Sequence, residues 1–210
     1  ISRGLVGSEM CIRDRILDFG SQYTQLIARR VREIGVFSEV KPSSISTEEI
    51  IKMNPSGIIL SGGPETVTIS SSQKVHKSLL EAKIPILGIC YGMQTIANEL
   101  GGTVVKSDIR EFGHAEISHV NQSILFDNVS FDSDSLDVWM SHGDKVEVIP
   151  ENFEIIASSK DCKVAGFQNS DSNIFGLQFH PEVTHTNQGE QILSNFIFKV
   201  CSCSKNWSTS

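Results

Sequence analysis

A cysteine in a glycine-flanked turn is the feature of this sequence that points most directly to chemistry. The short apolar run at residues 84–89 leads into Gly-Ile-Cys-Tyr-Gly, centred on Cys90, and a helix-compatible stretch follows. This order is typical of a nucleophile elbow, a sharp strand-to-helix turn that exposes one side chain at the end of a sheet. A thiol is mostly protonated at neutral pH, so a cysteine nucleophile needs a neighbouring base.

A histidine and a glutamate near the other end of the chain can supply that base. Residues 176–182 read Gly-Leu-Gln-Phe-His-Pro-Glu, which places His180 two positions before Glu182. A histidine can take the thiol proton, and a carboxylate fixes the tautomer of the histidine. Either motif alone is more often an ordinary turn. Their joint occurrence, each after an apolar run, predicts a Cys-His-Glu triad.

A second histidine competes for the role of base. His142 belongs to the sequence Ser-His-Gly-Asp at 141–144, which also follows an apolar run. We favour His180, which follows a strand-like run and has the carboxylate of Glu182 two positions further on. The other histidines are expected to be solvated or structural; they are His76, His114, His119 and His185.

An oxyanion formed by attack of Cys90 on a carbonyl needs two hydrogen-bond donors. One candidate is the backbone N–H of Tyr91, at the start of the following helix, whose N-terminus also favours the thiolate. The other is the N–H of Gly63 in the loop Ser-Gly-Gly-Pro, although such turns are common without a function. Gln94, one helical turn after Cys90, is placed to bind an amide or a carboxylate, or is simply a partly exposed helix residue.

Composition narrows the class of protein. The chain has 210 residues, of which 39% are hydrophobic and 20% charged, enough for one domain with a substantial core. A net charge of -7 without a Lys/Arg cluster argues against nucleic-acid binding, and no apolar stretch approaches the roughly 20 residues of a membrane span. The five cysteines show no disulfide framework or metal-site spacing, which predicts a reducing, cytoplasmic setting and no metal centre.

Strand-like and helix-like segments alternate in the first half. Beyond a short apolar start at 16–17, we expect strands at 36–40, 57–60 and 84–89, and helices at 22–34, 46–54, 72–82 and 91–100. From residue 103 the pattern changes to short strands, which we expect at 103–106, 115–120, 137–140, 145–149, 155–158, 164–168 and 173–179, before a last helix at 188–200. The sequence therefore predicts an α/β fold: a central, mostly parallel sheet flanked by helices, with additional short antiparallel strands in the second half.

Residues 1–15 do not fit this pattern. They show no clear period, mixed charges and no apolar signal-peptide core, so we interpret them as a foreign or mistranslated leader before a domain at 16–200. Only the two apolar residues at 16–17 then remain of a first strand that should be a longer apolar run. Burying the charged residues at 13–15 without partners would cost on the order of several kcal/mol.

The motifs, taken in chain order, resemble those of the class I (triad) glutamine amidotransferase family. They are Ser-Gly-Gly-Pro, Gly-Ile-Cys-Tyr-Gly-Met-Gln and Gln-Phe-His-Pro-Glu. Three longer stretches, at 17–23, 137–146 and 180–186, resemble more narrowly the glutaminase half of the GMP synthases, and the resemblance covers residues 16–207. It implies the class I amidotransferase-like fold and hydrolysis of L-glutamine to glutamate and ammonia through a Cys90 thioester.

The resemblance also implies a role for each site residue. Carried over position by position, the resemblance makes Cys90 the nucleophile, His180 the base and Glu182 the carboxylate that orients the base. The oxyanion hole would be formed by Gly63 and Tyr91. The glutamine-binding residues would be Gln94, Ser141, His142, Gly143 and Asp144. No cofactor and no metal are implied for the glutaminase step.

A synthetase domain is the partner that the resemblance implies. In the family it uses the ammonia, with ATP and Mg²⁺, to convert XMP to GMP in purine biosynthesis. Its loop Ser-Gly-Gly-x-Asp-Ser does not occur here, since the one Ser-Gly-Gly continues as Pro-Glu-Thr, and residues 201–210 resemble the start of the linker to that domain. We therefore expect a fragment that binds glutamine but not ATP, nucleic acid or a membrane, with low activity on its own.

Three alternatives stay open. The chain could be the glutaminase component of another amidotransferase, such as that of anthranilate or carbamoyl phosphate synthesis, although Trp-Met-Ser-His-Gly-Asp at 139–144 argues against both. It could be a catalytically silent binding or regulatory module, which need not retain Cys90, His180 and Glu182. A peptidase-like γ-glutamyl hydrolase would cleave γ-glutamyl peptides, and the lack of a secretory signal counts against it.

Overall fold

The computed structural model describes residues 14–205. Its strands are β1 (Asp14–Asp18), β2 (Ser38–Pro42), β3 (Gly57–Leu60), β4 (Ile86–Ile89), β5 (Thr103–His119), β6 (Ser135–Val148), β7 (Glu154–Ser159), β8 (Gly166–Asn169) and β9 (Ile174–Leu177). Its helices are α1 (Thr24–Ile34), α2 (Thr47–Lys52), α3 (Lys77–Leu80), α4 (Tyr91–Glu99) and α5 (Gly189–Ser194), with a 3₁₀ turn at Ile124–Phe126 and a π-helical turn at Asn195–Val200.

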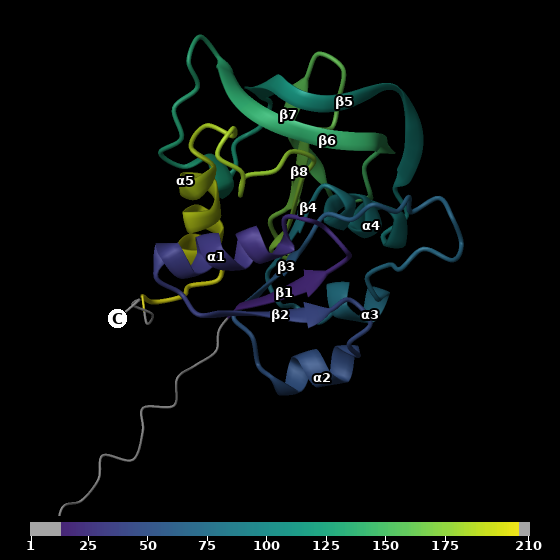
Figure 1. Ribbon diagram of the computed structural model, residues 1–210, viewed down its shortest axis with the longest axis vertical. Coiled ribbons are helices and arrows are strands. Elements are labelled where there is room, and N and C mark those ends of the chain that lie inside the picture. The colour runs from purple at the N-terminus through teal and green to yellow at the C-terminus, as the bar shows by residue number, and fades with distance from the viewer. Residues whose placement is uncertain (1–13, 206–210) are drawn as a thin grey trace, which may run out of the picture.

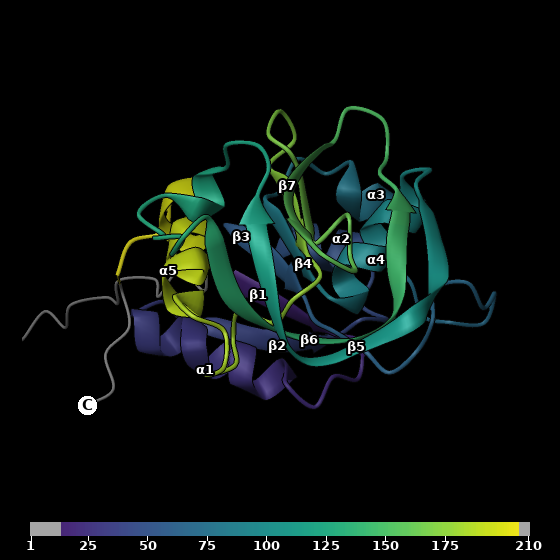
Figure 2. The same ribbon diagram turned by 90° about the horizontal axis from the view of Figure 1, so that it is seen from above.

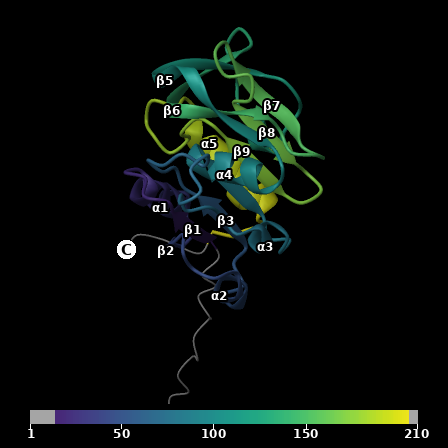
Figure 3. The ribbon, with the colours of Figure 1, turned by 90° about the vertical axis from the view of Figure 1, so that its right-hand side faces the viewer.

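All nine strands of the described residues join one sheet, in the order β2-β1-β3-β4-β9-β8-β7-β5-β6 (Figure 1). The pairs from β2 to β9 are parallel, and the pairs from β9 to β6 are antiparallel. The two long strands β5 and β6 form a curved hairpin beyond the parallel part (Figures 1 and 3). The predicted fold class, a mostly parallel sheet extended by antiparallel strands, is confirmed.

Helices cover both faces of the parallel strands, as the alternating pattern predicts. Figure 2 shows α1 and α5 on one side and α3 and α4 on the other. Successive residues of a strand point to opposite faces, so Ile16 packs in the core under α1 and α5 while Leu17 packs in the core under α3 and α4. Among the described residues, no helix is both long enough and apolar enough to cross a membrane.

Strand β1 begins two residues before the expected domain start, and its buried arginine has partners. Arg15 is 3% exposed, its guanidinium lies 3.7 Å from a carboxylate oxygen of Glu39, and its Nε donates to the sulfur of Met53. These contacts offset the desolvation penalty that the sequence led us to expect. The rest of the predicted leader, residues 1–13, and residues 206–210 of the predicted linker lie outside the described part of the chain.

Two groups of element boundaries differ from expectation. The predicted helix at 72–82 is reduced to α3, because the preceding segment is held extended against α4, where the Val75 N–H donates to the Thr95 hydroxyl. The four short strands predicted between 103 and 149 are two continuous strands, β5 and β6. A register shift between Lys106 and Glu111 interrupts the alternation of side chains, which hides the continuity in the sequence.

The first turn of α4 packs directly on β3, and this contact generates a stability prediction. A Cβ atom at Gly92 would overlap the backbone carbonyl of Leu60. We expect Gly92→Ala to lower the free energy of unfolding by about 3 kcal/mol or more, measured by urea denaturation.

Gly101 provides the matched control for this substitution. A Cβ there meets nothing within 4 Å, and only its φ of +89° opposes alanine, so Gly101→Ala should cost about 1 kcal/mol. Equal losses for the two variants would contradict the proposed close packing of α4 on β3.

Candidate active site

Cys90 is the single residue between β4 and α4, and its backbone makes the predicted sharp turn. Its φ is 53° and its ψ is -108°, a conformation that side-chain-bearing residues rarely adopt. The Cys90 N–H donates to the Leu177 carbonyl on β9 at 2.7 Å. A Cβ at Gly88 would lie 2.6 Å from the backbone of Gly92, so the turn requires the small residues on either side of the cysteine.

His180 and Glu182 meet beside this turn in the order that a triad requires. His180 Nδ1 lies 2.8 Å from Glu182 Oε1, and the two side chains are 4% and 0% exposed. Burial by itself lowers the pKa of His180, but the Glu182 carboxylate and hydrogen bonds with Cys90 and Glu182 raise it well above its usual value. The structure thus brings together all three residues of the predicted triad, with the histidine between the thiol and the carboxylate.

The competing histidine has the wrong environment for a base at neutral pH. The His142 side chain is 1% exposed, and burial lowers its pKa to about 4. Its Nδ1 lies 2.9 Å from the Asp144 carbonyl. The geometry therefore supports His180 as the base, as we expected.

Two adjoining cavities meet at the thiol. One, of about 330 Å³, is lined by the loop at 20–23 and by His180, and the other, of about 300 Å³, is lined by Gln94 and by residues 142–144 of β6. Both cavities are lined by Gly63, Pro64, Cys90 and Ser141. Each cavity is near the lower end of the size range of ligand pockets, about 300 Å³, which suits a small substrate.

The two residues predicted to form the oxyanion hole line the second cavity. A Cβ at Gly63 would lie 2.6 Å from the Phe19 carbonyl, so this loop position needs a glycine. The Ser61 hydroxyl accepts a hydrogen bond from the Phe19 N–H at 3.0 Å, which ties the loop to the end of β1. Tyr91 is the first residue of α4, where a backbone N–H has no acceptor within the helix. The role of both N–H groups as oxyanion donors stays a prediction.

The predicted glutamine-binding residues line the same cavity, and two of them also hold its wall. Gln94 Nε2 donates to the Asp144 carbonyl at 2.8 Å and to Gln178 Oε1 at 3.3 Å, and His142 bonds the same carbonyl. The carbonyl of Ser141 accepts a weak hydrogen bond from the Cys90 thiol at 3.5 Å. Residues 141–144, which belong to β6 rather than to a loop, are therefore fixed next to the nucleophile, and their direct contact with glutamine remains a prediction.

Sequence reasoning missed Thr186, which fixes the position of the base. Its hydroxyl donates to the His180 carbonyl at 2.6 Å and accepts from the Trp139 N–H at 3.0 Å, while the His180 N–H donates to the Trp139 carbonyl. Tyr23 packs edge-on against the His180 ring, with centroids 5.3 Å apart. Thr186 lies in the family-like stretch at 180–186, so the stretch marked the segment without revealing this contact.

Removing the Thr186 hydroxyl should displace the base. Thr186→Val leaves a buried carbonyl and a buried N–H without their partner, which we expect to cost about 1–3 kcal/mol of stability and to slow alkylation of Cys90 by iodoacetamide. Thr186→Ser keeps the hydroxyl and is the control, so it should retain the wild-type alkylation rate. An unchanged rate in the valine variant would show that the hydroxyl does not position His180.

Removing the Glu182 carboxylate should lower the pKa of His180, because that carboxylate is the main group that raises it. In Glu182→Gln the imidazolium that stabilises the thiolate is lost at a lower pH than in the wild type. Alkylation of Cys90 at pH 7, followed by peptide mass mapping, should slow at least about tenfold. Glu190→Gln, at an exposed carboxylate in the first turn of α5, should change nothing; an unchanged rate in Glu182→Gln would contradict the assignment.

Comparison with known proteins agrees with this geometry. Residues 15–200 match the family model for glutamine amidotransferase class-I. The GMP synthase [glutamine-hydrolyzing] of Ruthia magnifica is 55% identical over 195 residues, which are 92% of this chain and 37% of that protein. The enzyme of the same name from Pseudomonas entomophila is 52% identical, over 93% of this chain and 38% of that protein. The chain thus spans less than two fifths of the length of these curated relatives.

Solved structures share the fold. A candidate GMP synthase subunit from Thermoplasma acidophilum superposes with a TM-score of 0.79 at 33% identity, covering 91% of this chain and 94% of that one. A glutamine amidotransferase from Thermotoga maritima gives a TM-score of 0.72 at 19% identity, over 91% of this chain and 99% of that one, and this likeness concerns the fold alone. Given the family match over most of its length, this chain belongs to the class I glutamine amidotransferase family.

Proposed function

We propose that this chain is the glutaminase module of a GMP synthase and hydrolyses L-glutamine to glutamate and ammonia. The observation that carries the proposal is that Cys90 and His180 line one cavity, while His180 Nδ1 lies 2.8 Å from Glu182 Oε1. The names of the curated relatives, both GMP synthase [glutamine-hydrolyzing], support the choice among amidotransferases.

The first half-reaction transfers the glutamyl group to sulfur. His180 accepts the thiol proton, and the Cys90 sulfur attacks the side-chain carboxamide carbon of glutamine. The N–H groups of Gly63 and Tyr91 stabilise the resulting oxyanion. When the tetrahedral adduct collapses, the C–N bond breaks, His180 returns its proton to the leaving nitrogen, and ammonia departs from a thioester.

The second half-reaction restores the enzyme. A water molecule loses a proton to His180 and attacks the thioester carbon, and the C–S bond breaks to release glutamate and the Cys90 thiolate, which regains the proton. Glu182 keeps one tautomer and one orientation of the imidazole throughout both half-reactions. The side chains of this site suffice for the hydrolysis, and we propose no cofactor for it.

A synthetase module is the proposed user of the ammonia. This part of the proposal rests on the relatives, of whose length the chain spans 37–38%. In that module XMP would be activated with ATP and Mg²⁺ and converted to GMP. A cytoplasmic location fits the four free cysteines of the described residues, since thiols persist in reducing compartments.

Replacement of Cys90 tests the proposal directly. We expect Cys90→Ser to lower glutamate release from glutamine by at least about 10³-fold, because the hydroxyl is a far weaker nucleophile beside the same base. Glutamate would be measured by mass spectrometry, with the synthetase module of a close relative added together with XMP, ATP and Mg²⁺. Cys203→Ser is the matched control and should retain the wild-type rate.

Each of the other possible outcomes would indicate a different function for this chain. Release that survives in Cys90→Ser would exclude the thioester route. If neither the wild type nor any variant releases glutamate, although all of them bind the synthetase module, the chain is a catalytically silent module. Cleavage of γ-glutamyl peptides in preference to free glutamine would indicate a hydrolase of that class.

A further inference from the structure

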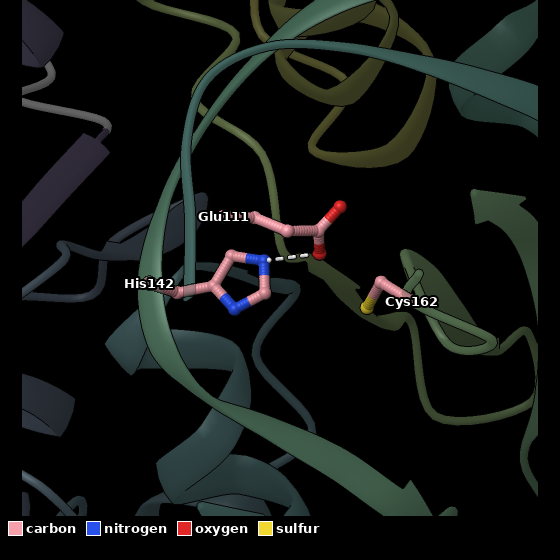
Figure 4. Close-up of side chains that lie close together, drawn as sticks. All are labelled: Glu111, His142 and Cys162. Atoms are coloured by element: carbon pink, nitrogen blue, oxygen red, sulfur yellow. Dashed lines mark ion pairs between the residues drawn. The ribbon is translucent and has the colours of Figure 1, made fainter. Parts of the chain in front are cut away.

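Three side chains that could bind a metal ion meet beside β6, on which one of them lies. Glu111 comes from β5, His142 from β6 and Cys162 from the turn between β7 and β8, and Figure 4 shows them directed toward one another. One ligand atom of each lies within 4.8 Å of the others. His142 Nε2 is 3.0 Å from Glu111 Oε2.

The tautomer of His142 makes this contact unfavourable as it stands. Its Nδ1 lies 2.9 Å from the Asp144 carbonyl, and a carbonyl can only accept, so Nδ1 carries the hydrogen. In a neutral imidazole Nε2 is then a bare lone pair, and it faces a carboxylate oxygen. Both atoms are shielded from solvent, and neither makes a hydrogen bond with any residue that the structure describes. Two buried lone pairs at this distance require a cation or a proton between them.

We propose that Glu111, His142 and Cys162 bind one Zn²⁺ ion. An imidazole nitrogen, a thiolate and a carboxylate are the protein ligands that zinc takes, and three of them leave a fourth position for water. The His142 Nδ1–H bond to a backbone carbonyl is the outer-shell contact that orients a zinc-bound histidine. The Ser159 hydroxyl donates to the other oxygen of Glu111 at 3.4 Å.

Binding exchanges one weak contact for a metal–sulfur bond. The Cys162 thiol now donates to the Val164 carbonyl at 3.3 Å. On binding, the S–H bond breaks, the proton passes to solvent and the sulfur becomes a thiolate ligand, with no change of oxidation state. The nearby ammonium of Lys145 opposes a cation here, and the Asp161 carboxylate offsets it.

The location suggests what the ion does. A groove of about 750 Å³, lined by Glu111 and Asp161 among others, lies beside the three side chains. An ion bound by these three side chains links β5, β6 and the β7–β8 turn. Because His142 also lines the cavity at Cys90, the ion stiffens the wall of that cavity. The site stands independently of the proposed glutaminase reaction, because its evidence is the geometry of three residues outside the triad.

Cobalt binding provides the test, because Co²⁺ is a coloured substitute for Zn²⁺. The full chain, stripped with a chelator and checked for folding by circular dichroism, would be titrated with Co²⁺ and then with Zn²⁺. We expect one equivalent of Co²⁺ with a thiolate-to-cobalt charge-transfer absorption in the near ultraviolet, displaced by Zn²⁺, and a melting temperature that rises with Zn²⁺. A folded wild-type chain without this absorption at excess Co²⁺ would overturn the proposal in favour of a shared proton.

Variants identify the ligands. Cys162→Ser should abolish the charge-transfer absorption, and Glu111→Gln should weaken Co²⁺ binding at least about tenfold. The control is His114→Gln, which alters the second, exposed cluster formed with Glu116 and Asp137 and should leave the stoichiometry at one equivalent. An absorption that survives in Cys162→Ser would place the cobalt elsewhere and contradict the site; if a variant fails to fold, the wild-type titration alone decides.

Discussion

The abrupt turn at Cys90 constrains the rest of the structure. The chain passes from β4 into α4 at a single residue with a φ of 53°, which lifts the thiol above the end of the sheet. This path requires glycine at two positions, because α4 packs closely on β3 at Gly92 and on β4 at Gly88. The cost of the unusual backbone conformation is offset by the surrounding packing and by the hydrogen bond from Cys90 to β9.

The order of strands in the sheet then brings the base to the nucleophile. Strand β9 pairs in parallel with β4, with Leu177 opposite Ile89, so the segment after β9 leaves the sheet at the same end of the strands as Cys90. His180 lies three residues further along, and its backbone bonds with Trp139 and Thr186 attach it to β6. The antiparallel half of the sheet therefore supplies the support that holds the histidine, and residues 141–144 of its strand β6 supply one wall of the cavity.

Local sequence patterns predicted those structural elements that depend only on neighbouring residues. The elbow and the apolar strands β3 and β4 each follow from a few neighbouring residues. The motif Gln-Phe-His-Pro-Glu also predicted which histidine lies beside Cys90. The alternation of strands and helices predicted the mostly parallel sheet, and the family-like stretches added the specific class I amidotransferase-like fold.

What escaped prediction depends on contacts between distant segments. Arg15 is buried beside Glu39 of the neighbouring strand, and Thr186 bonds Trp139 across the molecule. The cluster of Glu111, His142 and Cys162 comes from three separate segments, so no spacing in the sequence announces it. The continuity of β5 likewise depends on its pairing with β6 past a register shift, which a pattern of alternating residues cannot reveal.

Glutamine hydrolysis requires that the thiol, the base and the substrate cavity are assembled in this chain. Intact-mass labelling with a glutamine-shaped electrophile, followed by peptide mapping of the adduct, measures this assembly. We expect an assembled site, with one adduct per chain, on Cys90 alone, that excess L-glutamine prevents. A folded chain that gains no adduct on Cys90, or that is labelled equally at its other cysteines whether or not glutamine is present, would contradict this expectation.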